Sequence, residues 1–141
     1  MYRRSRIELF VHLVWATEGR APLLHGEVQR MVYRCIEAQA RELGCVVLAI
    51  GGMPDHTHLV TRIPSTICIA DLARNAKGAS SRLASDDPQG SRDFTWQRGY
   101  GAFSLCPPHV DKAIAYVLGQ KEHHAGGTTW PRLEETDEEA P

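Results

Sequence analysis

The chain has 141 residues, of which 43% are hydrophobic and 23% are charged, as in one ordinary globular domain with a normal core. No apolar stretch is long enough to span a membrane, so no membrane partner is expected. The net charge of −1 hides an asymmetry, because 5 of the 17 acidic residues lie within 134–139. The rest of the chain is basic, which is compatible with a polyanionic partner, although solvated charge explains it equally well.

The cysteines form no C-x-x-C pair, which excludes a zinc framework, and a core of this size needs no disulfides. They are therefore expected to be buried reduced thiols of a cytoplasmic protein: Cys35, Cys45, Cys68 and Cys106. The N-terminal apolar run is interrupted by Glu8 and His12, unlike a signal peptide. We expect one domain over residues 1–130 and an acidic, disordered tail over 131–141.

The first half of the chain predicts a strand, a helix and a hairpin. Residues 7–16 alternate apolar and polar side chains with a period of two, which indicates a strand. Residues 27–43 have helical spacing, and Gly44 ends that helix. Strands over 45–50 and 56–63 flank the turn sequence GGMPD.

The second half predicts a helix, a strand and a last helix. Ser65 is the expected N-cap of a helix over 65–84. Residues 94–106 are strand-like but interrupted by glycine, and Pro107 introduces a helix to about His124.

The resulting order, β-α-β-β-α-β with an extra C-terminal helix, predicts an α+β, ferredoxin-like fold with two helices on one face of an antiparallel sheet. The opposite face needs cover from the C-terminal helix or from a second subunit.

His56 and His58 are two residues apart on a predicted strand, so both imidazoles lie on one face and form half of a divalent-metal site. Thr57 points to the other face, and Asp55 is placed to orient a ligand histidine. An edge strand with two half-exposed histidines is the alternative, and for H-x-H alone it is favoured. The preceding turn makes the metal site the preferred interpretation.

Tyr116 and Gln120 are four residues apart on the last predicted helix and share one face. The glutamine offers a neutral oxygen to a hard cation. The tyrosine offers a nucleophile whose pKa of about 10 a nearby cation would lower. A packed tyrosine and a solvated glutamine are the alternative. His124 is a rival ligand and His123 a weaker one.

Basic and aromatic side chains predict contacts with phosphates and bases. The predicted DNA-binding set is Arg3, Arg4, Arg6, Arg74, Lys77, Arg82, Arg98 and Tyr100. On the helix over 65–84 the expected core side chains are Ile69, Leu72, Ala76 and Leu83. A solvated helix face is the alternative for any single cation.

Three other tyrosines are rival nucleophiles: Tyr100 first, then Tyr2 and Tyr33. His12 lies on the strand face opposite Leu13 and Trp15. It is either near the metal or a hydrogen-bonded sheet histidine, and the second interpretation is preferred.

Five strings together resemble the HUH-superfamily single-tyrosine transposases of small bacterial insertion sequences and their repeat-associated relatives. The strings are HLVWAT at 12–17, GGMPDHTHLV at 51–60, KGASSRL at 77–83, WQRGYGAFS at 96–104 and AYVLGQKEHH at 115–124. The resemblance runs from about residue 5 to 124, in one order and spacing.

The resemblance implies a dimerising ferredoxin-like core that cleaves and rejoins single-stranded DNA, often at hairpins. It matches the family's metal ligands to His56, His58 and Gln120, with Mg²⁺ or Mn²⁺ bound, and its catalytic tyrosine to Tyr116. That tyrosine forms a 5′-phosphotyrosine link, either within its own subunit or in the partner's site.

Two residues depart from the family pattern. Thr57 replaces a bulky hydrophobe but is still β-branched, and Gly119 precedes Gln120 where a better helix former is expected. Two other functions stay open: a non-catalytic DNA- or RNA-hairpin-binding module, and a metal-dependent hydrolase of small phosphoesters.

Overall fold

The computed structural model describes residues 5–120, 124–125 and 127. The four strands are β1 (Leu9–Ala16), β2 (Val46–Met53), β3 (His56–Ile63) and β4 (Gly101–Leu105). The three α-helices are α1 (Gly26–Glu42), α2 (Ile69–Asp86) and α3 (Val110–Leu118), with short 3-10 helices at Glu18–Arg20 and Pro107–His109. The predicted order of elements is confirmed.

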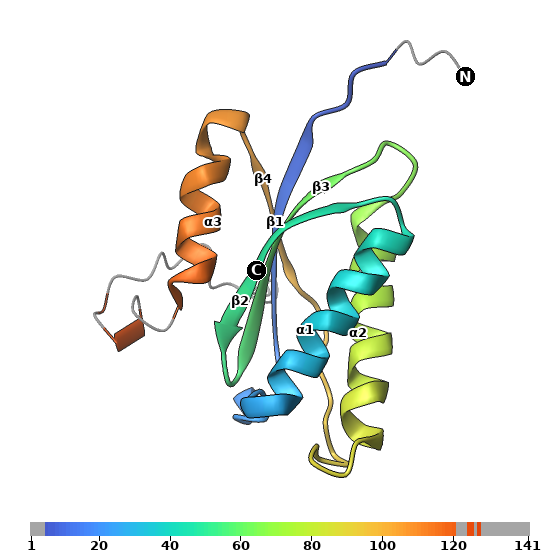
Figure 1. The fold of residues 1–141 in the computed structure, drawn as a ribbon, viewed down its shortest axis with the longest axis vertical. Coiled ribbons are helices and arrows are strands. Elements are labelled where there is room, and N and C mark those ends of the chain that lie inside the picture. Colours follow the sequence, from blue (N-terminus) through green and yellow to red (C-terminus); the bar gives the residue numbers. More distant parts are fainter. Residues whose placement is uncertain (1–4, 121–123, 126, 128–141) are drawn as a thin grey trace, which may run out of the picture.

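The sheet is antiparallel, with the strand order β2-β3-β1-β4. Helices α1 and α2 pack together on one face, and α3 lies against β2 and β3 on the other (Figure 1). The predicted ferredoxin-like arrangement is therefore confirmed, and the C-terminal helix supplies the cover for the second face.

The two faces of the sheet differ because side chains alternate along each strand. Leu13 and Trp15 of β1 point toward α1 and α2 and join the main apolar core. His12 and Val14 point the other way, toward α3, where the apolar cluster is only Ala49, Val60, Ala113 and Val117.

Helix α3 packs directly on the backbone of β2. A Cβ atom at Gly51 would lie 2.4 Å from the carbonyl oxygen of Val117. Gly51 of the GGMPD sequence therefore lets α3 pack closely on the sheet. The same sequence also reverses the chain.

Four predicted boundaries were wrong. Strand β2 runs on to Met53, so only Pro54 and Asp55 of the GGMPD sequence form the turn. Helix α2 begins at Ile69 rather than after Ser65, because residues 65–66 form a turn and Cys68 is the N-cap. Strand β4 is shorter than 94–106. Helix α3 ends at Leu118, and Gly119 is its C-cap with φ −96° and ψ 18°.

Three side chains lie at the surface where the sequence predicted burial. Cys68 and Cys106 are exposed, and Leu83 of α2 is 40% exposed. Ala73 and Ser80 fill the buried face of α2 instead, because the helix is rotated relative to the predicted apolar stripe. None of the helices in the described ranges is long and apolar enough to cross a membrane. The predicted acidic tail lies outside the described residues.

Candidate metal and tyrosine site

His56 and His58 lie on β3, which is an internal strand hydrogen-bonded to β1 and β2. Their side chains face α3 and are buried, at 2% and 0% exposure, with ring centroids 5.1 Å apart. The alternative of two half-exposed histidines on an edge strand was therefore wrong. Thr57 is buried against the α1 face, beside Tyr33, as predicted.

Each of these histidines makes a hydrogen bond through its Nδ1 atom. The Nδ1 of His56 lies 2.7 Å from Oδ1 of Asp55, and the Nδ1 of His58 lies 2.8 Å from Nε2 of His12. An imidazole that donates from Nδ1 carries on Nε2 the lone pair that a metal ion uses. The Asp55 carboxylate accepts from His56 and so favours for that ring the tautomer that suits metal ligation. In the His12–His58 pair either nitrogen can be the donor.

The preferred interpretation of His12, a hydrogen-bonded sheet histidine, is confirmed. It is a fully buried sheet histidine with a hydrogen bond, and the partner in that bond is one of the paired histidines. The signal for this was cross-strand pairing, since His12 and His58 come from neighbouring positions on paired strands.

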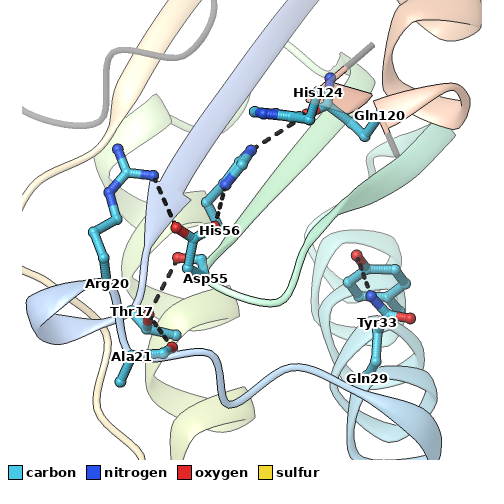
Figure 2. A network of polar contacts seen from close by, with 9 residues as sticks. All are labelled: Thr17, Arg20, Ala21, Gln29, Tyr33, Asp55, His56, Gln120 and His124. Atoms are coloured by element: carbon cyan, nitrogen blue, oxygen red, sulfur yellow. Dashed lines mark hydrogen bonds and ion pairs between the residues drawn. The ribbon is translucent and has the colours of Figure 1, made fainter. Parts of the chain in front are cut away.

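Helix α3 brings Tyr116 and Gln120 to the same place. The tyrosine ring is 1% exposed, and its centroid lies 5.9 Å from that of His58. The glutamine is 2% exposed, so the alternative of a solvated glutamine was wrong. Its Oε1 lies 3.2 Å from Nε2 of His56 and 3.0 Å from Nε2 of His124 (Figure 2).

Gly119, where a better helix former was expected, is the C-cap of α3. Gln120 begins the next turn of the chain and still bonds back, through its Nε2, to the carbonyl oxygen of Tyr116 at 3.3 Å. The rival ligand His124 stacks near His56, with ring centroids 5.0 Å apart. His123 lies outside the described residues.

Two imidazole nitrogens and an amide oxygen are donors that suit a divalent cation. Within the described ranges, no three side chains of His, Cys, Asp or Glu are grouped so as to hold a metal ion. The three predicted ligands, His56, His58 and Gln120, lie together at this site. The third of them would bind through an amide oxygen.

The rival tyrosines lie elsewhere. Burial raises the pKa of Tyr33 to about 12, partly offset by a hydrogen bond from Gln29, and a higher pKa disfavours the nucleophilic phenolate. Tyr100 packs against the apolar core on the α1 and α2 side of the sheet. Tyr2 lies outside the described residues.

Three of the predicted DNA-binding cations lie away from this site. Helix α2 carries Arg74, Lys77 and Arg82 on the far side of the sheet from α3 (Figure 1). The Lys77 amine donates to the carbonyl oxygens of Gln97 and Gly99, both at 2.8 Å, and burial lowers its pKa.

Of the remaining predicted cations, Arg6 is exposed and bonded to Glu8, and Arg98 is exposed in the loop before β4. Arg3 and Arg4 lie outside the described residues.

The sequence prediction missed Arg20, which lies beside the histidines. Its guanidinium is 3.8 Å from Oδ2 of Asp55 (Figure 2). The pairing of Ala16 with His56 carries the chain after β1 to this place. Cross-strand register between the first and third strands was the signal that could have identified it.

Comparison with known proteins identifies the family. The profile of the family described as "Transposase IS200 like" matches residues 5–120. The chain therefore belongs to the IS200-like transposases.

Individual relatives agree. The chain is 33% identical over 75 residues to the ISDra2 transposase TnpA of Deinococcus radiodurans, and this match covers 53% of the chain and 54% of the relative. The chain thus spans about half the length of that relative.

Two solved structures share the fold. A protein assigned as a transposase from Deinococcus radiodurans R1 superposes with a TM-score of 0.64 and 25% identity, over 85% of this chain and 96% of that one. A REP-associated tyrosine transposase bound to a REP hairpin gives a TM-score of 0.65 at 16% identity, over 93% and 79% of the two chains. The second likeness concerns the fold alone.

Proposed function

We propose that this protein is a metal-dependent transposase that cleaves and rejoins single-stranded DNA through a 5′-phosphotyrosine at Tyr116. The observation that carries this proposal is the convergence of two buried histidines from β3 with Tyr116 and Gln120 from α3. Apolar packing alone would not favour four buried polar side chains on a face with so small an apolar cluster.

His56, His58 and Gln120 would hold Mg²⁺ or Mn²⁺, and Asp55 and His12 would orient the two imidazoles. When bound, the cation supplies charge stabilisation to a phosphate oxygen and favours a phenolate beside it. The 3.2 Å separation between His56 Nε2 and Gln120 Oε1 shows that an imidazole nitrogen and an amide oxygen already face each other across the site.

The proposed chemistry exchanges one phosphodiester for another. The phenolic oxygen of Tyr116 attacks phosphorus, an O–P bond forms, and the bond from phosphorus to the 3′-oxygen breaks. The phenol gives up its proton and the leaving oxygen becomes a 3′-OH. Attack by a 3′-OH on the phosphotyrosine reverses these steps, so rejoining needs no nucleotide hydrolysis.

The substrate proposed is DNA with a hairpin, as in the relative that was solved with a REP hairpin. Tyr116 and Gln120 are almost completely buried, so both side chains have to become exposed before a phosphate can reach them. A homodimer, and use of the tyrosine in its own or its partner's site, stay predictions.

The test is a covalent-adduct assay. The protein is incubated with Mn²⁺ and single-stranded oligonucleotides from both strands flanking its gene, and linked products are mapped by mass spectrometry. We expect an adduct on Tyr116. We expect Tyr116→Phe to reduce cleavage on the order of 10⁴-fold or more, with DNA binding retained, because only the nucleophilic oxygen is removed.

Retained cleavage in Tyr116→Phe would overturn the assignment of the nucleophile. Hairpin binding without metal, and with no adduct in the wild type, would favour the non-catalytic binding module. Turnover of a nucleotide with no protein-linked intermediate would favour the small-phosphoester hydrolase.

A further inference from the structure

Arg20 is held beside the histidines by the backbone around it. The amide of Thr17 donates to the carbonyl oxygen of Asp55 at 2.9 Å, and its hydroxyl donates to the carbonyl oxygen of Ala21 at 2.7 Å. The amide of Arg20 then donates to the carbonyl oxygen of Thr17 at 3.0 Å. The loop after β1 and the turn before β3 are therefore one unit, which fixes the start of the Arg20 side chain relative to His56.

The backbone at Arg20 is strained. Its φ of +56° lies in the left-handed region, and among the described residues no other non-glycine residue has a positive φ. This conformation is uncommon for a non-glycine side chain, and such strain often occurs at functional sites. Glycine would fit better, so the presence of arginine points to a use for its side chain.

Two cavities reach the site, and they differ in charge. One of ≈400 Å³ opens beside Gln120 and is lined by uncharged residues. The other, of ≈380 Å³, opens beside His56 and His124 and is lined also by Arg20, Asp55 and three apolar residues. Of these two cavities, the second offers a cation to a phosphate and the first does not.

The ion pair with Asp55 does not occupy all the hydrogen-bond donors of the Arg20 guanidinium. Its 3.8 Å separation from Asp55 is longer than the 2.7–2.9 Å of a charge-assisted hydrogen bond. Oδ1 of Asp55 instead accepts from His56. The Arg20 side chain is 45% exposed, so its donors can bind an anion while its charge offsets that of the carboxylate.

From this geometry we propose that Arg20 binds a backbone phosphate of single-stranded DNA at the mouth of the cavity beside His56. The inference rests on the proposed function and adds the residue that holds its substrate. A planar guanidinium binds two oxygens of one phosphate, and Arg20 thereby sets which phosphate approaches the histidines.

The strain supplies a sharp test, because Arg20→Gly relieves it. We expect Arg20→Gly to stay folded with an unchanged or raised melting temperature, while binding of a single-stranded oligonucleotide weakens roughly 10–100-fold. Binding is measured in a Tyr116→Phe background. The slope of log affinity against log salt should decrease by about 1, and Arg20→Lys should keep the wild-type slope.

Arg30→Ala is the matched control, since Arg30 is an exposed arginine of α1 paired with Glu27 at 2.9 Å. We expect it to leave affinity and slope unchanged. Replacing single phosphates by neutral methylphosphonates then locates the contact. One position next to the cleavage site should weaken binding of the Arg20 protein and have no further effect on Arg20→Gly.

Unchanged affinity and slope in Arg20→Gly would overturn the inference, as would equal losses in both proteins at every methylphosphonate. If the wild type forms the Tyr116 adduct and Arg20→Gly binds normally, the proposed function stands and this inference fails. If the Arg20 effect appears and no oligonucleotide gives an adduct, the phosphate site stands and the proposed chemistry fails.

Discussion

The two faces of the sheet are built from the same strands, but one packs against a large apolar core and the other carries buried polar side chains. Toward α1 and α2, β1 and β3 present Leu13, Trp15 and Leu59 to a large apolar core. Toward α3, the same strands present His12, His56 and His58, all buried. A strand alternates its side chains between faces, so one sequence can give stability to one layer and keep polar chemistry in the other.

This division means that damage to the two faces should be separable. A substitution on the α1 and α2 face should change the free energy of unfolding, and one on the α3 face should change metal binding and catalysis. Three substitutions test this separation of the two faces.

Ile36→Ala on α1 should cause the largest loss of stability. Ile36 is fully buried in the apolar core, and deletion of its side chain leaves a cavity, which costs about 2–5 kcal/mol of unfolding free energy. Denaturant unfolding measures that loss. Below the unfolding transition, Mn²⁺ affinity should equal that of the wild type. A matching loss of metal affinity would show that the faces are not independent.

His12→Leu should have the opposite effect and lower Mn²⁺ affinity rather than stability. Without its hydrogen-bond partner His12, the His58 ring loses its orientation, and Mn²⁺ affinity should fall about 10–100-fold, as measured by titration calorimetry without DNA. His12→Gln offers both a donor and an acceptor and should recover part of the affinity.

Thr57→Val is the control for His12, because Thr57 lies between the two histidines but is buried on the other face. It should leave Mn²⁺ affinity unchanged. Equal losses in His12→Leu and His12→Gln would mean that His12 only fills space.

Gly51→Ala tests how closely α3 must approach the sheet. The added methyl would collide with the carbonyl oxygen of Val117, so α3 must shift, at about 1–3 kcal/mol of unfolding free energy. Cleavage should fall as Tyr116 and Gln120 move away from the histidines. Gly78→Ala on α2 meets no atom within 4 Å and should stabilise the protein by about 0.5–1 kcal/mol. Normal cleavage by Gly51→Ala would contradict the close approach.

Local patterns in the sequence predicted much of this protein. Period-two alternation and the GGMPD turn were enough for β1 and the β2–β3 hairpin, because these signals act over a few residues. Spacings of two and four residues were enough to group His56 with His58 and Tyr116 with Gln120. The start of α2 was missed because Ser65 has the chemistry of an N-cap but lies in a turn.

Contacts between distant segments were decided only by the tertiary structure. The pairing of β1 with β3 brings His12 to His58 and carries Arg20 to Asp55, although neither pair is close in the sequence. Strand register and helix packing depend on which faces the whole chain can bury together. Local sequence patterns predicted the order of the elements and the two local pairs of candidate residues, and the tertiary structure placed His12 beside His58 and Arg20 beside Asp55.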